Sequence, residues 1–206
     1  MFFAKEGFAA STRDLADQLG VRQALLYKYF PSKEALLEAI FEDVLAAHWA
    51  MEWAKVLSDQ TKSLEERLTF FYIAHMKQED GIPLRLFQRA ALDGWLLPAR
   101  KLDMLREKLV RPVIADLRQA ANLPGYEAAP LMVGELELMM VLHSSMIFYS
   151  MRTHIYGGDL CPDMPAVVGL YVSTFLTGAK ASLAALHSPD APASFKTTLP
   201  AKKASA

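Results

Sequence analysis

Residues 11–33 have the sequence STRDLADQLGVRQALLYKYFPSK, which predicts two short helices joined by a tight turn and followed at once by a third. The first helix carries an apolar stripe made of Leu15, Ala16 and Leu19. The second helix carries another, made of Leu25, Leu26, Tyr29 and Phe30. Two helices this short cannot form a core alone, but when they cross closely they present the second helix outward.

Capping residues set the expected boundaries of these helices. Ser11 lies three residues before Asp14, so its hydroxyl can accept a hydrogen bond from the first turn of a helix that starts at Ser11 or Thr12. Gly20 ends this helix, since glycine enters the left-handed conformation at no steric cost. Pro31 stops the second helix, and Ser32 caps the third.

The spacing and residue types of this stretch together resemble the DNA-binding end of the tetracycline-repressor (TetR/AcrR) family. The matching residues are Ser11, Thr12, Arg13, Leu15, Ala16, Gly20, Val21, Leu26, Tyr27, Tyr29, Phe30, Ser32 and Lys33. Arg22 and Leu25 depart from the residues that are common in the family, so its base preference does not carry over. The resemblance implies an all-α fold, with an N-terminal helix-turn-helix head and a helical body that binds a ligand and dimerises.

The resemblance also implies which side chains contact DNA. Arg13 and Gln23 fall at base-reading positions; arginine suits guanine and glutamine suits adenine. Arg22 and Ala24 belong to the same surface. The expected phosphate contacts are Thr12, Tyr27, Lys28, Tyr29 and Lys33. Taken singly, each tyrosine could simply pack and each cation could be solvated, but the motif as a set favours DNA binding.

Charge is distributed unevenly along the chain. The formal net charge of the 206 residues is only −1, and 52% hydrophobic residues are ample for a sizeable core. Residues 1–33 carry five Lys or Arg and three acids, a balance of +2, whereas residues 34–54 carry five acids and no Lys or Arg. This polarity would orient the protein on a polyanion.

Other features exclude several classes of protein. Cys161 is the single cysteine, so no internal disulfide forms, and no signal peptide opens the chain; we expect a cytoplasmic protein. The apolar runs 138–151 and 164–179 fall short of a membrane span, so no membrane partner is expected. The histidines lack HExxH spacing, and no phosphate loop or nucleophile elbow occurs. We therefore expect no catalytic residues, metal or cofactor.

The rest of the chain predicts only helices. Residues 1–8 predict the end of a first helix that begins earlier in the family, so this helix is expected to be truncated. A connecting helix follows from Ser32 to about Trp53. Further helices are predicted near residues 64–79, 84–93, 99–121, 128–155 and 164–187, with Pro112 kinking the third of these or starting a new segment. The expected domains are a head at 1–48, a body at 49–187 and a disordered tail at 188–206.

The body supplies aromatic and methionine side chains with few polar groups, a composition that suits an adaptable pocket for an apolar or aromatic small-molecule effector. The alternative for each residue is plain core. The candidate pocket residues are Trp49, Trp53, Phe70, His75, Trp95, Met139, His143 and Tyr149. The helices near 128–155 and 164–187 are apolar on more than one face, which predicts either a pair of internal core helices or a homodimer interface. We favour the interface, because helix-turn-helix proteins usually bind palindromic DNA as two-fold symmetric dimers.

The sequence thus predicts a ligand-responsive transcriptional repressor that binds double-stranded operator DNA as a homodimer. Effector binding in the body is expected to release the operator. The alternative is a helical enzyme or a partner-binding protein with a body cavity. If the protein were an enzyme, His143 with Glu135 or Glu137 would be a conceivable catalytic pair.

Overall fold

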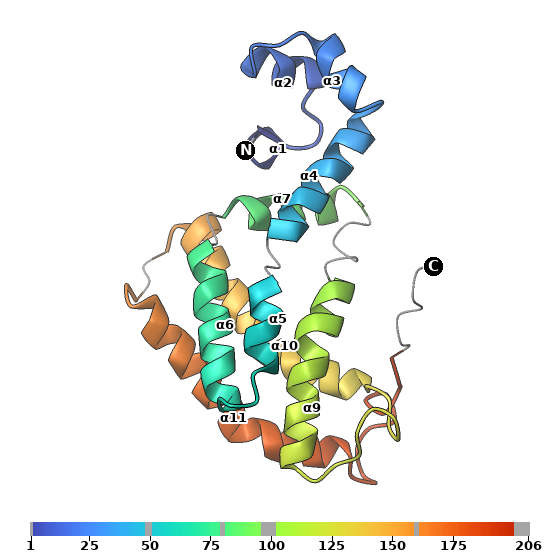
Figure 1. Ribbon diagram of the computed structural model, residues 1–206, viewed down its shortest axis with the longest axis vertical. Coiled ribbons are helices and arrows are strands. Elements are labelled where there is room, and N and C mark those ends of the chain that lie inside the picture. Colours follow the sequence, from blue (N-terminus) through green and yellow to red (C-terminus); the bar gives the residue numbers. More distant parts are fainter. Residues whose placement is uncertain (1, 48–50, 79–80, 96–101, 159–160, 200–206) are drawn as a thin grey trace.

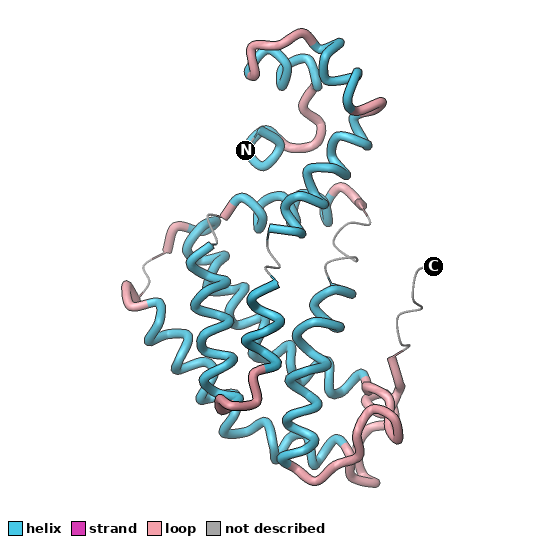
Figure 2. The backbone as a smooth tube through the Cα atoms, viewed as in Figure 1, coloured by secondary structure: helices cyan, strands magenta, loops and turns pink. Residues whose placement is uncertain are grey.

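The computed structural model describes residues 2–47, 51–78, 81–95, 102–158 and 161–199. The all-α prediction is confirmed, because the described residues form helices and no β-strand (Figures 1 and 2). The elements are α1 (Phe2–Glu6), α2 (Thr12–Gln18), α3 (Gln23–Tyr29), α4 (Lys33–Ala47), α5 (Met51–Ser58), α6 (Leu64–Gln78), α7 (Ile82–Leu92), the π-helical turn η1 (Arg106–Val110), α9 (Arg111–Ala120), α10 (Val133–Met151), the π-helical turn η2 (Arg152–Tyr156) and α11 (Met164–Leu186).

The helices form a small head and a larger body (Figure 1). Helices α1 to α4 make the head, and the helices from α5 to α11 make the body, with α7 lying across the junction. The head is packed around an apolar cluster, called here the head cluster, that includes Phe3, Phe8, Leu15, Leu37 and Phe41. This cluster also includes Leu86, Phe87 and Ala90 of α7, so the core of the head extends beyond the boundary expected at residue 48.

The predicted caps of the head are confirmed. Ser11 Oγ accepts a hydrogen bond from the Asp14 amide at 3.1 Å, and α2 begins at Thr12. Gly20 adopts a left-handed conformation with φ of 68°, where the chain turns toward α3. Ser32 Oγ accepts from the Ala35 amide at 3.1 Å at the start of α4. Each of these features depends on residues that are close in sequence.

The predicted apolar stripes of α2 and α3 are only partly buried. Leu15 is buried in the head cluster and Ala16 is also buried, but Leu19 is 58% exposed. In α3, Leu26 and Phe30 pack partly against the cluster, whereas Leu25 is 42% and Tyr29 is 69% exposed. Leu19, Leu25 and Tyr29, which the sequence places on the apolar stripes, therefore lie outside the core. A head of this size has room for one narrow face of each short helix, and α3 contains no buried residue at all.

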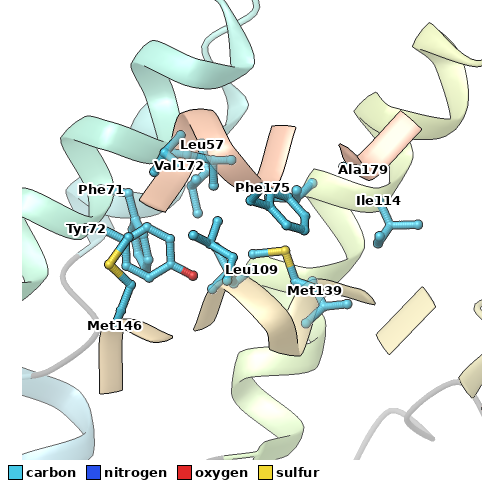
Figure 3. Close-up of a cluster of buried hydrophobic side chains, with 14 of the residues drawn as sticks. Leu57, Phe71, Tyr72, Leu109, Ile114, Met139, Met146, Val172, Phe175 and Ala179 are labelled. Carbon is cyan, nitrogen blue, oxygen red and sulfur yellow. The ribbon is translucent and has the colours of Figure 1, made fainter. Parts of the chain in front are cut away.

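The body is built around a second apolar cluster, called here the body cluster, to which α5, α6, η1, α9, α10 and α11 contribute (Figure 3). Its fully buried members include Tyr72 of α6, Leu109 of η1, Met139 of α10 and Val172 of α11. Helix α11 packs against α6, α9 and α10. Within the described residues it is the single helix whose length and apolar composition would allow it to cross a membrane. Here one of its faces lies in the body cluster.

In the body, the new segment predicted at Pro112 is confirmed, and the start of one helix differs from the prediction. The predicted helix 99–121 is helical from 102 to 120, and a π-helical turn precedes Pro112, which lies in the first turn of α9. A proline lacks the amide that the preceding turn needs, so a wider turn at this point is the expected adjustment. Helix α10 starts at Val133 rather than near 128, because carbonyls of residues 124–130 bond to the side chain of Arg118 instead of forming a helix. Residues 48–50, in the predicted connecting helix, lie outside the described part of the chain.

The described part of the C-terminal segment corrects the prediction of disorder at 188–206. The backbone of residues 195–199 pairs with that of residues 131–134, including Val133 N to Thr197 O at 2.8 Å and Leu199 N to Leu131 O at 2.8 Å. Leu199 also packs against the body cluster. Gly134 allows this approach, because a Cβ there would lie 2.9 Å from the Cβ of Phe195. Two apolar side chains and a paired backbone are enough to hold a segment that is otherwise rich in Pro, Ala and Lys.

Candidate nucleic-acid interface

Helices α2 and α3 are joined by a chain of side-chain hydrogen bonds. Gln23 Nε2 donates to Thr12 Oγ1 at 2.8 Å, and the Thr12 hydroxyl also lies 3.0 Å from the Tyr27 hydroxyl. Thr12 is 5% exposed, which is unusual for a polar side chain unless its hydrogen bonds are satisfied. These bonds fix the orientation of α3 relative to α2. Figure 1 shows both helices at the end of the head that lies farthest from the body.

Helix α3 and the residues that flank it carry cations without acidic neighbours in sequence. Between Gln18 and Lys33 the chain contains Arg22, Lys28 and Lys33 and no Asp or Glu. The side chains that stand exposed on the outer side of α2 and α3 are called here the recognition surface and are Arg13, Arg22, Ala24, Tyr27, Lys28 and Tyr29. The surface combines positive charge, aromatic edges and a helix with no buried residue, which is what a helix that enters a groove of a polyanion requires.

The hydrogen bonds change how two predicted contacts are interpreted. Thr12 was expected to contact phosphate, but its hydroxyl is buried and already bonded on two sides. Gln23 was expected to read a base, yet its amide nitrogen donates to Thr12 and its side chain is half-buried. Both residues position the recognition surface in this structure. The carbonyl oxygen of the Gln23 amide remains an acceptor for an external donor.

At the base of the recognition surface, the first turn of α4 carries Lys33, which is half-buried. The next residue, Glu34, has a lowered pKa because backbone and Ser32 hydrogen bonds favour its charged form. Glu34 therefore stays ionised directly beside Lys33. Along the chain, the acid-free stretch with its cations thus ends at Lys33, and the acidic stretch begins at Glu34. The predicted charge boundary between residues 33 and 34 coincides with the start of a helix.

Comparison with known proteins gives a match at the N-terminal end of the chain. Residues 1–40 match the family described as "Bacterial regulatory proteins, tetR family". This part of the chain is similar to the tetR family. The chain is also similar to the HTH-type transcriptional repressor KstR2 of Mycolicibacterium smegmatis, with 36% identity over 73 residues. That alignment covers 35% of this chain and 35% of the relative, so the chain matches about a third of the relative's length.

Among the described residues, the predicted pocket residues lie in different parts of the molecule. Phe70 of α6 is 55% exposed, so its predicted place in a pocket is corrected. Trp95 belongs to the head cluster, with its ring centroid 5.8 Å from that of Phe8, and is likewise corrected. Trp49 and the side chain of Trp53 lie outside the described part of the chain. Sequence spacing did not distinguish helix faces that point to the head, to solvent or to the body.

The remaining four candidates lie in or beside the body cluster. Met139 is fully buried and Tyr149 is buried. His75 is buried, with its ring stacked on Phe71 at a centroid distance of 6.0 Å. His143 is half-buried, and its Nδ1 lies 3.4 Å from the hydroxyl of Tyr72. Burial raises the pKa of Tyr72, so its hydroxyl is protonated at neutral pH and available as a donor.

The polar residues that sequence reasoning missed lie at the far end of the body. Arg118 is 1% exposed and forms two bonds of 2.6 Å to the carboxylate of Glu135, which is fully buried. His187 Nε2 lies 2.9 Å from the same carboxylate. These three residues, called here the distal polar cluster, connect the end of α9, the start of α10 and the end of α11. They are 17 or more residues apart, so no local spacing could have revealed them.

Hydrogen bonding accounts for the ionisation of the distal polar cluster. Burial acts to raise the pKa of Glu135, but hydrogen bonds from Arg118, from the Met132 amide and from His187 outweigh it and hold the pKa below its usual range. The pairing of His143 with Glu135 that the enzyme alternative would require is not formed, because Glu135 is bonded within this cluster and His143 faces Tyr72. Glu137 is exposed on α10. Within the described residues, no group of three or more His, Cys, Asp or Glu side chains could hold a metal ion.

Proposed function

We propose that this protein is a transcriptional repressor that binds double-stranded operator DNA through its recognition surface and releases it when a small molecule binds the body. The observation that supports DNA binding most strongly is α3 itself, which buries no residue and lies in a stretch with three cations and no acid. The tetR-family match over residues 1–40 covers this same region. The similarity to KstR2, which is a transcriptional repressor, agrees with this proposal.

The dimensions of α3 suit the major groove. Its seven residues rise about 10 Å at 1.5 Å each, and the groove of B-DNA is about 12 Å wide. Arg22 and Ala24, at the start of α3, would face the base edges together with Arg13 of α2. Lys28, Tyr29 and Lys33 would contact phosphates on either side. In this arrangement the bond between Gln23 and Thr12 keeps α3 at a fixed angle in the groove.

A homodimer would form through the outer face of α10 and α11. Val141 of α10 is 62% exposed and Leu170 of α11 is 61% exposed. They border an apolar groove of 430 Å³ between the two helices. Exposed apolar side chains at a groove are typical of an interface, and a second copy of this face would close a four-helix bundle. Two-fold symmetry would then place two recognition surfaces on one palindromic operator.

Helix α7 connects the head with the body in this mechanism. Arg89 Nη2 donates to the Lys5 carbonyl of α1 at 2.9 Å, while Arg85 Nη2 of the same helix contacts the His154 carbonyl at the end of η2. A shift of the body helices would therefore move α1. An effector that binds one body geometry more tightly shifts the population toward that geometry and changes the separation of the two heads. The Tyr72 and His143 pair offers polar groups to an otherwise apolar or aromatic effector.

A mobility-shift assay on DNA that flanks the protein's own gene tests the proposed function. We expect binding that depends on sequence and weakens steeply with salt, because phosphate contacts release counterions. A cytoplasmic location follows from this proposal. Equal binding to any sequence, or no binding at low salt, would contradict it.

Sedimentation tests the dimer separately. Val141→Glu combined with Leu170→Glu is expected to give a monomer, because four charges would be buried at the two-fold seam. Phe70→Glu is the matched control, since Phe70 is an equally exposed apolar residue on α6. A wild-type protein that sediments as a monomer would remove the seam from the proposal.

A further inference from the structure

A groove of 740 Å³ lies between the head and α7, separate from the body cluster. It is called here the junction groove. Helix α1 lines one side with Phe2 and Lys5, α2 contributes Gln18, and α7 lines the other side with Ile82, Arg85 and Arg89. Its volume falls within the range of small-molecule sites, about 300–1,000 Å³. Three helices from both parts of the molecule therefore surround one cavity.

Positive charge predominates in the junction groove. Arg85 and Arg89 are four residues apart on α7 and so lie on one face of that helix. Lys5 faces them from α1, and Glu6 is the single acid among the described residues that line the groove. Glu6 lies 3.5 Å from Lys5, but both side chains are largely exposed, so this pair is weak. The described lining of the groove thus has three cations against one carboxylate.

Both guanidinium groups are held in place by backbone carbonyls. Arg89 donates to Lys5 O and Arg85 donates to His154 O, each through Nη2. A guanidinium has five N–H groups, so each arginine keeps donors for a ligand. Gly7 makes room for Arg89, because a Cβ at this left-handed position would lie 2.5 Å from Arg89 Nη1. The two arginines are therefore oriented without using a carboxylate of the described chain.

The junction groove also has an apolar part. Phe2 and Ile82 are half-buried, and Ala4 is buried beside them. A ligand that fits this lining has an anionic group for the arginines and an apolar chain for the side formed by Phe2 and Ile82. An inorganic anion would leave the apolar part empty, and a neutral apolar molecule would leave the cations unpaired.

We propose that the junction groove binds an amphiphilic anion, a small molecule with a carboxylate or phosphate group at one end and an apolar chain at the other. Because α7 packs in the core of the head and its Arg85 also contacts the His154 carbonyl of η2, the bound anion acts at the contact between head and body. This site is separate from the recognition surface and from the body effector. Its existence does not depend on whether the protein binds DNA.

The test is a titration of the full chain with octanoate, followed by the ¹⁵N resonances of the arginine Nε groups. We expect saturable binding at one site per chain, with the largest shifts at Arg85 and Arg89. Two probes control for chemistry: 1-octanol has the chain without the charge, and inorganic phosphate has the charge without the chain. Each is expected to bind at least about tenfold more weakly, since a charge-assisted hydrogen bond or a buried short chain is worth about that factor.

Variants locate the site. Arg85→Gln removes a cation, and Gln18→Glu adds an anion at an exposed position without touching either arginine. Both are expected to weaken octanoate binding about tenfold or more, while Lys55→Gln, an exposed cation on α5, leaves it unchanged. Thermal melting checks that each variant is folded. If Arg85→Gln does not fold, Gln18→Glu alone provides the test. Equal binding by octanol, equal binding by phosphate, or unchanged octanoate affinity in Gln18→Glu would each overturn the proposal.

Discussion

Arg22 and Arg118 have the same side chain in opposite surroundings. Arg22 stands exposed at the start of α3, with no acid between residues 18 and 33. Arg118 is 1% exposed and bonds to the Glu135 carboxylate and to three backbone carbonyls. The recognition surface therefore keeps its charges available for an external partner, whereas the distal polar cluster uses its charges to join helices. Burial and partners, rather than residue type, separate function from architecture here.

The contrast extends to the way the two ends are built. In the head, a hydrogen-bonded set of side chains at Thr12 orients α3. The far end of the body holds α9, α10 and α11 together through a carboxylate that is fully buried. Substitutions at the two ends should consequently affect different quantities. Head substitutions should change DNA affinity, and substitutions in the distal polar cluster should change the free energy of unfolding.

The largest effect is expected for Arg118→Ala. It leaves the buried Glu135 carboxylate without its main partner and should lower the free energy of unfolding by about 3–5 kcal/mol, measured by urea denaturation. The double variant Arg118→Met with Glu135→Leu removes both charges, so its free energy of unfolding should fall by much less. If the single and double variants are equally unstable, the ion pair is not what makes Arg118 important.

A smaller effect is expected at the recognition surface, and on DNA binding instead of stability. Arg13→Ala should weaken binding to the preferred operator by about 1–3 kcal/mol and relax its base preference. Its free energy of unfolding should change by less than about 0.5 kcal/mol, because the side chain is exposed. Lys28→Ala is the comparison variant. It should weaken binding to DNA of every sequence by the same factor and reduce the salt dependence of that binding. The reverse pattern would exchange the roles of base reader and phosphate contact.

Removing the cap of α2 should have an effect of about 1 kcal/mol on stability. Ser11→Ala deprives the Asp14 amide of its acceptor at the start of the helix that supports α3. Ser11→Asp restores an acceptor and should recover the loss. Thermal unfolding measures both variants, and an unchanged melting temperature in Ser11→Ala would show that water replaces the cap.

The smallest effect is expected for the pH dependence of the free energy of unfolding near neutral pH. Because the folded-state pKa of Glu135 is lowered, its contribution to stability is fully present above its ordinary pKa of 4.5 and is lost as the pH falls through the folded value. We therefore expect no contribution of Glu135 to pH dependence near pH 7 and a destabilisation in acid. Urea denaturation across this range should show a shallower acid slope in Glu135→Gln than in the wild type. Equal slopes would mean that other carboxylates dominate.

The features that sequence predicted correctly are local ones. Ser11, Gly20 and Ser32 act on residues within one helical turn, so their roles follow from spacing. The distal polar cluster and the pairing of residues 195–199 with 131–134 join segments far apart in sequence, and no periodicity reveals such contacts. Leu19 shows a third limit. Helical spacing places it on the apolar stripe, but a head this small has no partner to cover it.

The candidate site was predictable to the same extent. Exposed cations such as Arg13 and Lys28 follow from the motif, but the bonds that bury Thr12 and hold Gln23 do not. The pocket residues were predicted less accurately, because a helix such as α6 presents Phe70 to solvent and His75 to the core. Assigning such residues requires knowing which neighbours surround each helix.

Amide hydrogen exchange in the presence and absence of operator DNA tests the difference between the two ends most directly. The operator can be taken from a mobility-shift selection. DNA is expected to slow exchange in residues 11–33 and to leave α9 and the start of α10 unchanged. Protection around Arg118 and Glu135 with none in α2 and α3 would contradict the assignment of the recognition surface.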